Sequence, residues 1–477
     1  MKIIPNYKLA KNIRSFDKGT NAFINQPWAS GGILLLCVII AMLLANLPFT
    51  RDLYRQILET ELSISVLSPL TDDGTRLMNW NFPMGMNVEK FINDILMVIF
   101  FFAVGLEIKR EIKFGELSST KKAMLPVIAA AGGMAMPAII FTLFNYGTAA
   151  SSGWGIPTAT DIAFAVGIMS FLGDKVPVSL KVFLTALAIA DDLGAILVVA
   201  FFYGGSINIV LLAISLLILA FTFVLNQIGE KRMIFYLIPA IAVWFLFYYA
   251  GIHATMSGVV MAMMIPMEPR YSRAYLVRRS HEYNCRMEKY DNYEATAEEN
   301  FPNELQRHCL RQMTHINNNS MGMSYRLEHA LTPWVNFCIM PIFALANAGV
   351  EIPDLSYFNI FQYSPEIGSV GMGVFLGLLI GKPLGITFAS WLAIKLKVGA
   401  MPKNATWKML FAVACLGGIG FTMSIFVDTL SFADAPNYTE QLQASGKIAV
   451  LMGSLCAGIL GSILINLISK FQNRTND

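Results

Sequence analysis

Three acidic residues and one basic residue lie deep inside long apolar runs of this sequence. Asp161 lies in GIPTATDIAFAVG, Asp191 and Asp192 are neighbours in LTALAIADDLGAILVVA, and Lys382 lies in GLLIGKPLGITFA. An ionisable side chain inside a lipid bilayer is energetically expensive and usually marks a pathway or a binding site. The four residues therefore indicate a charged site at membrane depth.

The adjacent aspartates come near the middle of the apolar run 178–203, so a helix there places both carboxylates near the bilayer midplane. Both must face the interior of a helix bundle or a water-filled cavity. Two carboxylates this close do not both ionise freely in a poorly hydrated site. The pair can hold protons or, after losing them, a small hard cation such as Na⁺. This competition is the physical basis of cation/proton exchange; the alternative is a pair held only by hydrogen bonds.

Two apolar runs contain helix-breaking residues. GIPTATD precedes an apolar half-helix, and CLGGIGFTMS interrupts another run with Gly417, Gly418 and Gly420. Unwound backbone at membrane depth is tolerated where it lines a cavity or is buried in protein, and paired interruptions point to a transporter site. Half-helix ends carry partial charges, which Asp161 and Lys382 can neutralise, while Thr160 offers a hydroxyl and a carbonyl. The alternative for the glycines is close helix packing.

A second group of charges lies at predicted helix ends. The segment FFAVGLEIKRE spaces its charges for contact on one helix face, and YRLEHAL begins another span. Carboxylates among bases and a histidine can form a mouth whose charge changes near neutral pH; the alternative is ordinary interfacial charge. A further histidine occupies the predicted turn GIHATMSG. The residues concerned are Glu107, Arg110, Glu111, Glu328, His329 and His253.

The composition fits a membrane protein. Of 477 residues, 55% are hydrophobic and 14% charged, whereas soluble domains carry about 25% charged residues. A net charge of +3 is too small to imply nucleic-acid binding. The six cysteines form no Cys-x-x-Cys pair, so neither a disulfide framework nor a zinc site is expected. We expect no cleavable signal peptide.

Reading for runs of about 20 apolar residues gives about twelve spans. These are 28–47, 91–108, 123–145, 156–172, 178–203, 206–226, 233–250, 252–266, 327–348, 369–394, 408–427 and 446–469. Lys and Arg concentrate in alternate loops, which predicts that both termini are cytoplasmic. The expected organisation is an N-tail (1–27), helices 1–8 (28–266, with 48–90 as an outside loop or hairpin), a cytoplasmic insert loop (267–325, with a short helix as the alternative), helices 9–12 (326–470) and a tail (471–477).

The segments ATDIAFAVG, ALAIADDLGAI, FFAVGLEIKRE, GIHATMSGV, PIFALANAGV, LLIGKPLGI and GGIGFTMSIF resemble, in order, the signatures of NhaA-type bacterial Na⁺/H⁺ antiporters. The resemblance runs from about residue 27 to 470. It implies an all-α integral membrane protein of twelve helices in the bacterial inner membrane. Spans 3–5 would be an inverted copy of spans 10–12, and spans 4 and 11 would be broken and crossing.

The resemblance also implies residue roles. It implies pH-regulated, electrogenic export of Na⁺ or Li⁺ in exchange for protons, serving pH homeostasis and salt tolerance, without a cofactor and by alternating access. Asp191 and Asp192 match the positions that bind the cation and the proton, and Asp161, Thr160 and Lys382 match those at the helix crossing. The positions tied to pH response are Glu107, Arg110, Glu111, Glu328 and His253.

Two segments depart from the family pattern, and three other functions stay open. The stretch 267–325 is longer than the usual connection, which affects the expected pH response. The 48–90 loop is also enlarged, and in the family this region forms a hairpin that holds a homodimer. A cation-coupled symporter would need a pocket for an organic substrate. An intramembrane aspartyl protease would need two Asp on facing helices, which only Asp161 with Asp192 could mimic. A passive channel would not need titratable groups at a midplane crossing.

Overall fold

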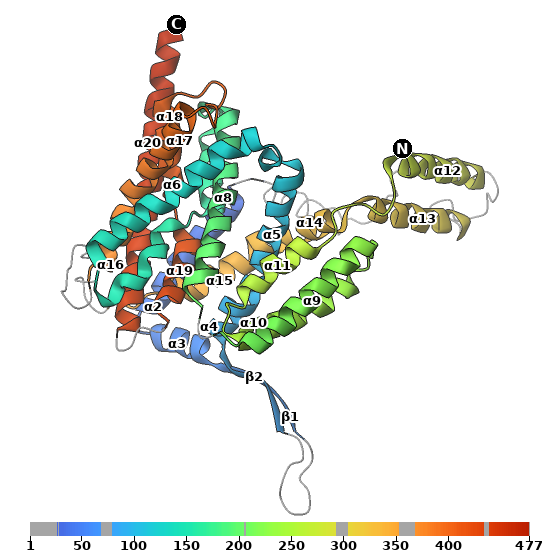
Figure 1. Cartoon of the computed structure of the whole chain (residues 1–477), viewed down its shortest axis with the longest axis horizontal. Helices are drawn as coiled ribbons and strands as arrows, with labels where there is room; N and C mark the ends of the chain where they lie inside the picture. The colour runs from blue at the N-terminus through green and yellow to red at the C-terminus, as the bar shows by residue number, and fades with distance from the viewer. Residues whose placement is uncertain are drawn as a thin grey trace, which may run out of the picture.

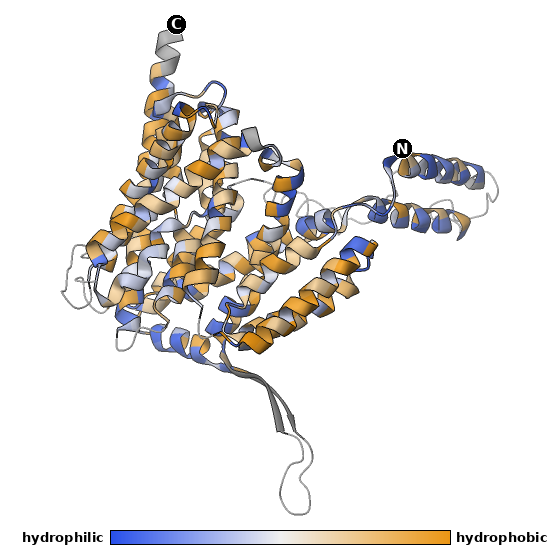
Figure 2. Cartoon of the chain, viewed as in Figure 1, coloured by the Kyte–Doolittle hydropathy of each residue, from blue (hydrophilic) through white to orange (hydrophobic). Residues whose placement is uncertain are grey.

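The protein is a bundle of apolar helices with a β-hairpin at one end and a helical arm at its side (Figure 1). The computed structural model describes residue 26 and residues 28–67, 79–204, 207–291, 304–352, 368–433 and 438–476. Most residues of the bundle helices are hydrophobic (Figure 2), and many of their large apolar side chains are exposed. Phe201, for example, is 78% exposed and Leu217 is 71% exposed. So much exposed apolar surface is typical of a protein surrounded by lipid.

Within the described residues, eight helices are long and apolar enough to cross a membrane. Three of them contain a π-helical turn, which interrupts the regular hydrogen-bond pattern. The eight are α2 (Ala29–Asn46), Val88–Phe114 (α4, Val88–Phe91; η1, Ile92–Leu96; α5, Met97–Phe114), α6 (Thr120–Asn145), α8 (Val178–Phe202), α9 (Ile209–Ile228), Met323–Asn347 (α14, Met323–Trp334; η5, Val335–Ile339; α15, Met340–Asn347), Val370–Lys395 (α16, Val370–Leu376; η7, Gly377–Gly381; α17, Lys382–Lys395) and α20 (Thr439–Asn476).

Two further spans are broken, as the sequence predicts. The 3₁₀ helix η3 (Ala149–Thr158) and α7 (Ile162–Phe171) meet at a bend of 41°. The helices α18 (Trp407–Gly417) and α19 (Phe421–Ser431) meet at 49°. Counting each bent pair as one span gives up to ten in the part of the chain that is described.

Two shorter apolar helices cover the predicted runs 233–250 and 252–266. They are α10 (Ile234–Ala250) and α11 (Thr255–Met264). Both are shorter than the roughly 20 residues needed to cross a bilayer. The structure therefore supports a multi-pass membrane protein, and the count of twelve passes and the inverted repeat stay predictions.

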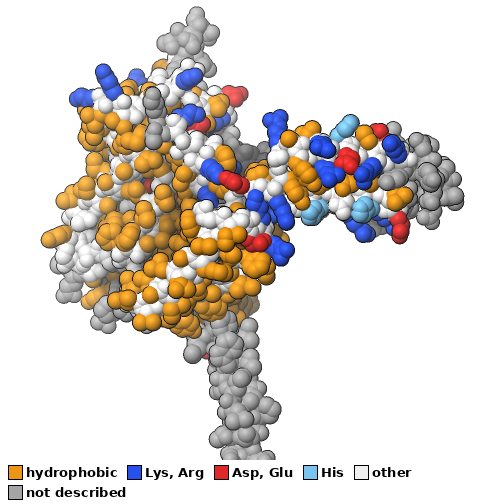
Figure 3. Space-filling model, turned by 45° about the vertical axis from the view of Figure 1, so that its right-hand side comes forward, with side chains coloured by type: hydrophobic (Ala, Val, Ile, Leu, Met, Phe, Trp, Pro, Cys, Tyr) orange, Lys and Arg blue, Asp and Glu red, His pale blue; other side chains and the backbone are white. Residues whose placement is uncertain are grey.

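The region 48–90 forms a helix and the predicted hairpin. Helix α3 (Arg51–Glu59) lies across one end of the bundle, where the sequence analysis had not predicted a helix (Figure 1). Strands β1 (Glu61–Leu67) and β2 (Asn79–Asn87) pair antiparallel, with an irregularity in the register between Leu62 and Ile64. The tip, 68–78, lies outside the described residues. We call this end of the molecule the hairpin end, and the opposite end, where Lys and Arg gather, the basic end (Figure 3).

The stretch 267–325 is not simply a loop, which corrects the preferred sequence-based expectation. It contains α12 (Arg273–Asp291) and α13 (Glu304–Ser320), which pack against each other beside the bundle (Figure 1). Charged pairs at helical spacing support α12: Glu282 accepts from Arg279 at 2.7 Å and from Arg286 at 2.6 Å. Cys309 and Ile316, one heptad apart on α13, are buried. Residues 292–303 of the insert lie outside the described residues.

The two predicted tails differ from each other. All of the N-tail (1–27) except residue 26 lies outside the described residues. At the other end, α20 continues as one helix to Asn476. The predicted boundary between helix 12 and the tail 471–477 is therefore not a helix end in the structure. Long helices of this kind extend past the apolar core because their backbone hydrogen bonds are local and do not depend on lipid.

Candidate ion-binding site at the helix crossing

The two broken spans cross each other in the middle of the bundle. The backbone N–H of Asp161 donates to the carbonyl of Ile419 at 2.7 Å, so the two unwound segments are joined directly. The glycines of the second segment allow this close approach. A Cβ at Gly418 would come within 2.4 Å of the Leu378 carbonyl oxygen, and one at Gly420 would lie 3.1 Å from the carbonyl of Ala159. Larger residues cannot occupy these positions without moving the backbone.

Asp161 lies at the N-terminal ends of both inner half-helices. Its carboxylate accepts from the backbone N–H of Phe164, in α7, at 3.2 Å and from that of Thr422, in α19, also at 3.2 Å. The Thr422 hydroxyl donates to the same carboxylate at 2.5 Å. Helix N-termini carry partial positive charge, which a carboxylate stabilises. The Asp161 carboxylate therefore bonds the N-terminal ends of two half-helices at once.

Lys382 lies at the C-terminal, carbonyl end of η3, whereas Asp161 bonds helix N-termini. It is the first residue of α17, directly after the π-helical turn Gly377–Gly381, and its side chain is fully buried. Its Nζ donates to the carbonyl of Thr158, the last residue of η3, at 2.5 Å. It also forms an ion pair with Oδ2 of Asp191 at 2.7 Å. The ammonium thus compensates both a carbonyl end and one member of the aspartate pair.

The aspartate pair on α8 faces this crossing. Asp191 is 0% exposed and Asp192 is 3% exposed. The Thr160 hydroxyl lies 2.5 Å from Oδ2 of Asp191 and 3.0 Å from the Gly417 carbonyl. It has one proton to donate, so it bonds one of these acceptors at a time. Among the described residues, Oδ1 of Asp191 and Oδ1 of Asp192 are buried without a hydrogen-bond partner.

The site offers two unpaired carboxylate oxygens, a hydroxyl and an ammonium, and these groups determine which ions it can bind. A buried carboxylate oxygen without a donor is costly, and either a proton or a bound cation removes that cost. Hard cations prefer carboxylate, hydroxyl and carbonyl oxygens, all of which are present here. The described residues contain no cluster of three or more His, Cys, Asp or Glu that could hold a metal ion.

The residues predicted to respond to pH fall into two groups. Arg110 lies 3.1 Å from Glu111, 3.2 Å from Glu328 and 3.8 Å from Glu107, at the basic end of α5 and α14. His329, beside Glu328, contacts the Tyr325 hydroxyl instead at 2.7 Å. The structure thus joins four of the predicted residues in one cluster around Arg110.

His253 lies elsewhere. It directly precedes the first turn of α11. The last turn of α11 lies near Arg110, because the neighbouring Lys109 donates to the carbonyls of Met263 and Ile265 at 2.6 and 2.5 Å. The length of α11, about 15 Å, separates the two regions. The His253 Nε2 lies 2.7 Å from the carbonyl of Tyr203, at the end of α8. His253 is therefore a packed turn residue rather than part of the cluster.

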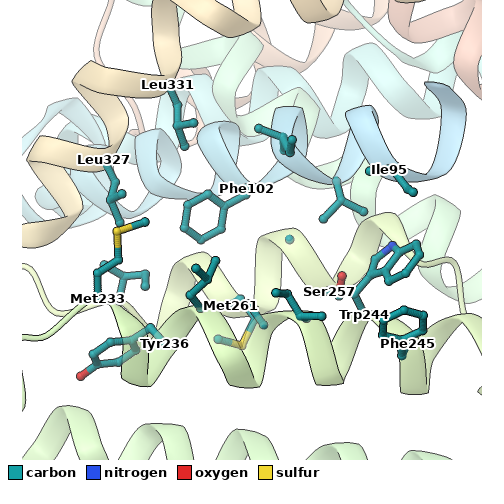
Figure 4. Close-up of a pocket in the computed structure, with 17 residues that line it drawn as sticks. Ile95, Phe102, Met233, Tyr236, Trp244, Phe245, Ser257, Met261, Leu327 and Leu331 are labelled. Carbon is teal, nitrogen blue, oxygen red and sulfur yellow. The ribbon is translucent and has the colours of Figure 1, made fainter. Parts of the chain in front are cut away.

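A large apolar pocket lies away from the crossing. Its volume is about 510 Å³, and α5, α10, α11 and α14 line it. Figure 4 shows Phe102, Met261, Leu327 and Leu331 around the same space. None of its lining residues belongs to the crossing, so this pocket does not place an organic molecule beside the carboxylates.

Sequence reasoning missed three features. The Ser454 hydroxyl of α20 accepts from the N–H groups of Gly420 and Phe421 at 3.2 and 3.1 Å, which completes the N-terminus of α19. Asn93 and Asn347 form reciprocal amide hydrogen bonds of 3.0 and 2.8 Å in the core. A lone serine or asparagine in an apolar run gives no signal of such a role. The third feature, Asp428, is fully buried in α19, although the predicted span 408–427 ends one residue before it.

Comparison with known proteins identifies the family of this chain. The family model described as "Na+/H+ antiporter 1" matches residues 21–465. A protein named Na(+)/H(+) antiporter NhaA from Sulfurimonas denitrificans is 40% identical, covering 96% of this chain and 98% of the relative. Proteins of the same name from Pelagibacter ubique (39%; 96% of this chain and 100% of the relative) and Wolinella succinogenes (38%; 95% and 94%) are similar over their lengths. This chain therefore belongs to the Na⁺/H⁺ antiporter 1 family, which includes the NhaA antiporters.

Proposed function

We propose that this chain exchanges Na⁺ or Li⁺ for protons across the bacterial inner membrane. The observation that carries the proposal is the buried pair Asp191 and Asp192, each with an unpaired carboxylate oxygen, beside two broken helices that cross. The names of the relatives point to the same activity. The transported ions are the only small partners we propose, and no cofactor takes part.

Competition between ions at one site couples the two fluxes. When the pair is open to one side, protons neutralise the two carboxylates, and on the other side Na⁺ displaces them. If both carboxylates release a proton for each Na⁺ bound, a full cycle moves unequal charge and is electrogenic. Lys382 and Asp161 hold the helix ends in place while the crossing opens alternately to each side.

The orientation follows from the charges. We propose that the basic end faces the cytoplasm and the hairpin end faces outward, because Lys and Arg accumulate on the cytoplasmic side of membrane proteins (Figure 3). Helices α10 and α11 then complete twelve passes, and both termini are cytoplasmic. The hairpin β1–β2 projects beyond the bundle and is available to join two copies into a homodimer (Figure 1).

The cluster around Arg110 is the proposed pH-responsive mouth. Glu107, Glu111 and Glu328 share one guanidinium, so adding or removing a proton on any of them changes how the others pair. Oε2 of Glu328 and Nε of Arg110 are buried without a partner within the described part of the chain. The cluster is therefore incompletely paired and can rearrange at modest cost.

The other functions receive no comparable support. An aspartyl protease needs a free facing carboxylate, but Asp161 is committed to Phe164 and Thr422. A symporter would need an organic-substrate pocket at the carboxylates, and the apolar pocket of Figure 4 lies elsewhere. The titratable groups at the crossing also favour exchange over a passive channel.

The test is Na⁺-dependent dissipation of a pH gradient in everted membrane vesicles across a range of pH. Asp192→Asn should abolish the exchange while the protein remains inserted, because an amide cannot hold and release the proton. Asp174→Asn, which alters an exposed carboxylate just before α8, is the matched control and should exchange normally. Normal exchange by Asp192→Asn would refute the proposal. A proton gradient that drives Na⁺ uphill would exclude a channel.

A further inference from the structure

A fourth carboxylate lies inside the bundle, and the exchange site does not use it. Asp428, in α19, is 0% exposed. Both of its carboxylate oxygens lack a hydrogen-bond partner within the described residues. An isolated buried carboxylate costs several kcal/mol unless it is paired or protonated. Its presence in a well-packed core therefore requires a reason.

Asp428 faces α20 at a point where only glycine fits. A Cβ at Gly446 would lie 1.8 Å from Oδ1 of Asp428, so the carboxylate occupies the space of the missing side chain. The next residue, Lys447, is half-buried, so an ammonium group lies one position along α20 from this contact. The other elements packed on α19, η3 and α15, carry no acidic or basic residue. The charged residues of α5, which contacts α19 through Phe101 and Phe426, begin only at Glu107.

One more titratable group lies within electrostatic reach. Tyr203, at the end of α8, interacts with Asp428. Its hydroxyl donates to the carbonyl of Ser152 at 2.8 Å and accepts from the N–H of Gly155 at 3.1 Å. Tyr203 is therefore engaged with η3, and Lys447 is the charged residue next in sequence to the glycine that contacts Asp428.

Lys447 connects this buried carboxylate to a polar vestibule. A cavity of about 760 Å³ opens at the hairpin end between α3, α15 and the start of α20. Its charged lining residues are Arg51, Arg55, Glu59, Glu89, Glu351, Glu440 and Lys447. Lys447 thus contributes to the vestibule wall and also lies beside Asp428.

On its other side, Asp428 is connected to the crossing by one face of α19. Gly420, Ser424 and Asp428 follow at intervals of four residues, so they lie in a row along the helix. Ser424 is fully buried, and within the described structure its hydroxyl has no partner. The rise from Thr422, which bonds Asp161, to Asp428 is about 9 Å. Unpaired polar groups therefore continue from the vestibule towards the crossing.

We propose that Asp428 is a proton-binding station that passes protons between the hairpin-end vestibule, by way of Lys447, and the crossing, by way of Ser424. The ligand is a proton rather than Na⁺, because Na⁺ needs several oxygen ligands and neither carboxylate oxygen of Asp428 has a polar partner within the described residues. The carboxyl takes up a proton from the vestibule side, where Lys447 lies, and releases it inward along the face of α19 that carries Ser424. The proposal rests on the proposed exchange for its purpose but not for its chemistry.

The transport test varies the pH at one face only. Right-side-out vesicles loaded with radioactive Na⁺ are exposed to a series of outside pH values at fixed internal pH. Asp428→Asn, which is isosteric, should slow Na⁺ efflux by roughly tenfold at alkaline outside pH, where protons are scarce, and little at acid pH. In everted vesicles, varying the pH at the basic end should leave the ratio of variant to parent unchanged. Glu440→Gln removes an exposed vestibule carboxylate and controls for surface charge.

An infrared pH titration of the purified protein tests proton binding without transport. The parent should show a protonated-carboxyl band that titrates and that Asp428→Asn lacks. Absence of such a difference overturns the proposal, as does a transport loss that is equal at every outside pH, which is the signature of a structural role. If the parent itself does not exchange Na⁺ for H⁺, the proposed function fails, while the infrared band still decides whether Asp428 binds a proton.

Discussion

Removing the ammonium of Lys382 should destabilise the protein strongly. Lys382 and Asp191 are both 0% exposed and their charged atoms are 2.7 Å apart. Breaking a buried ion pair by removing one partner typically costs about 3–5 kcal/mol, because the other charge stays buried and uncompensated. Lys382→Met keeps the apolar stem and should lower the free energy of unfolding by about that amount at neutral and alkaline pH.

A second substitution identifies the cause. Lys382→Met combined with Asp191→Asn removes both charges and should recover much of the lost stability, since replacing a whole buried pair with neutral groups is often close to neutral. The recovery should be incomplete, because the carbonyl of Thr158 also loses its donor.

The assay is thermal unfolding of the detergent-solubilised protein, followed for the parent, both single variants and the double variant across pH. The four proteins form a double-mutant cycle that isolates the coupling between the two side chains. If Lys382→Met is as stable as the parent at every pH, or if the double variant is no more stable than Lys382→Met, the ion pair does not hold the crossing and the argument is wrong.

Three further predictions concern other parts of the molecule. Gly418→Ala places a Cβ 2.4 Å from the Leu378 carbonyl oxygen and should cost about 1–3 kcal/mol, measured as a lower unfolding temperature. An unchanged unfolding temperature would contradict the close packing of this break against the turn Gly377–Gly381. Arg110→Gln removes the cation that Glu107, Glu111 and Glu328 share, so the pH profile of exchange should shift while the maximal rate changes little. A pH profile identical to that of the parent would exclude the cluster as the regulator. In the arm, the hydrogen bond from Arg279 lowers the pKa of Glu282, so the pair stabilises the arm above the ordinary pKa of a glutamate and loses that contribution as the pH falls. Arg279→Gln should raise the pKa of Glu282 towards its ordinary value of 4.5, measured by carbon-13 NMR of the carboxyl. An unchanged pKa would show that the pair does not form in solution.

Some expectations depended on local patterns and were correct at the level of elements. The two interruptions, GIPTATD and CLGGIGFTMS, predicted broken spans, because proline and clustered glycines disfavour a continuous helix wherever the rest of the chain lies. The insert 267–325 shows the limit of this reasoning. Its polar composition suggested a loop, whereas the pairing of α12 with α13 allows both segments to form helices.

The sequence alone determined which charges lie at membrane depth, since an acid inside a long apolar run must be buried whatever the packing. It could not determine which partner each charge would have. Lys382 pairs with Asp191 rather than Asp192. Asp161 bonds Thr422. Both pairings arise only because helices that are distant in sequence meet at one crossing. Asp428 shows the same limit, because near a span end only the packing of Gly446 against α19 decides between exposure to water and burial. Burial along a run follows from local hydropathy, but the neighbours of a side chain follow from the tertiary arrangement of the helices.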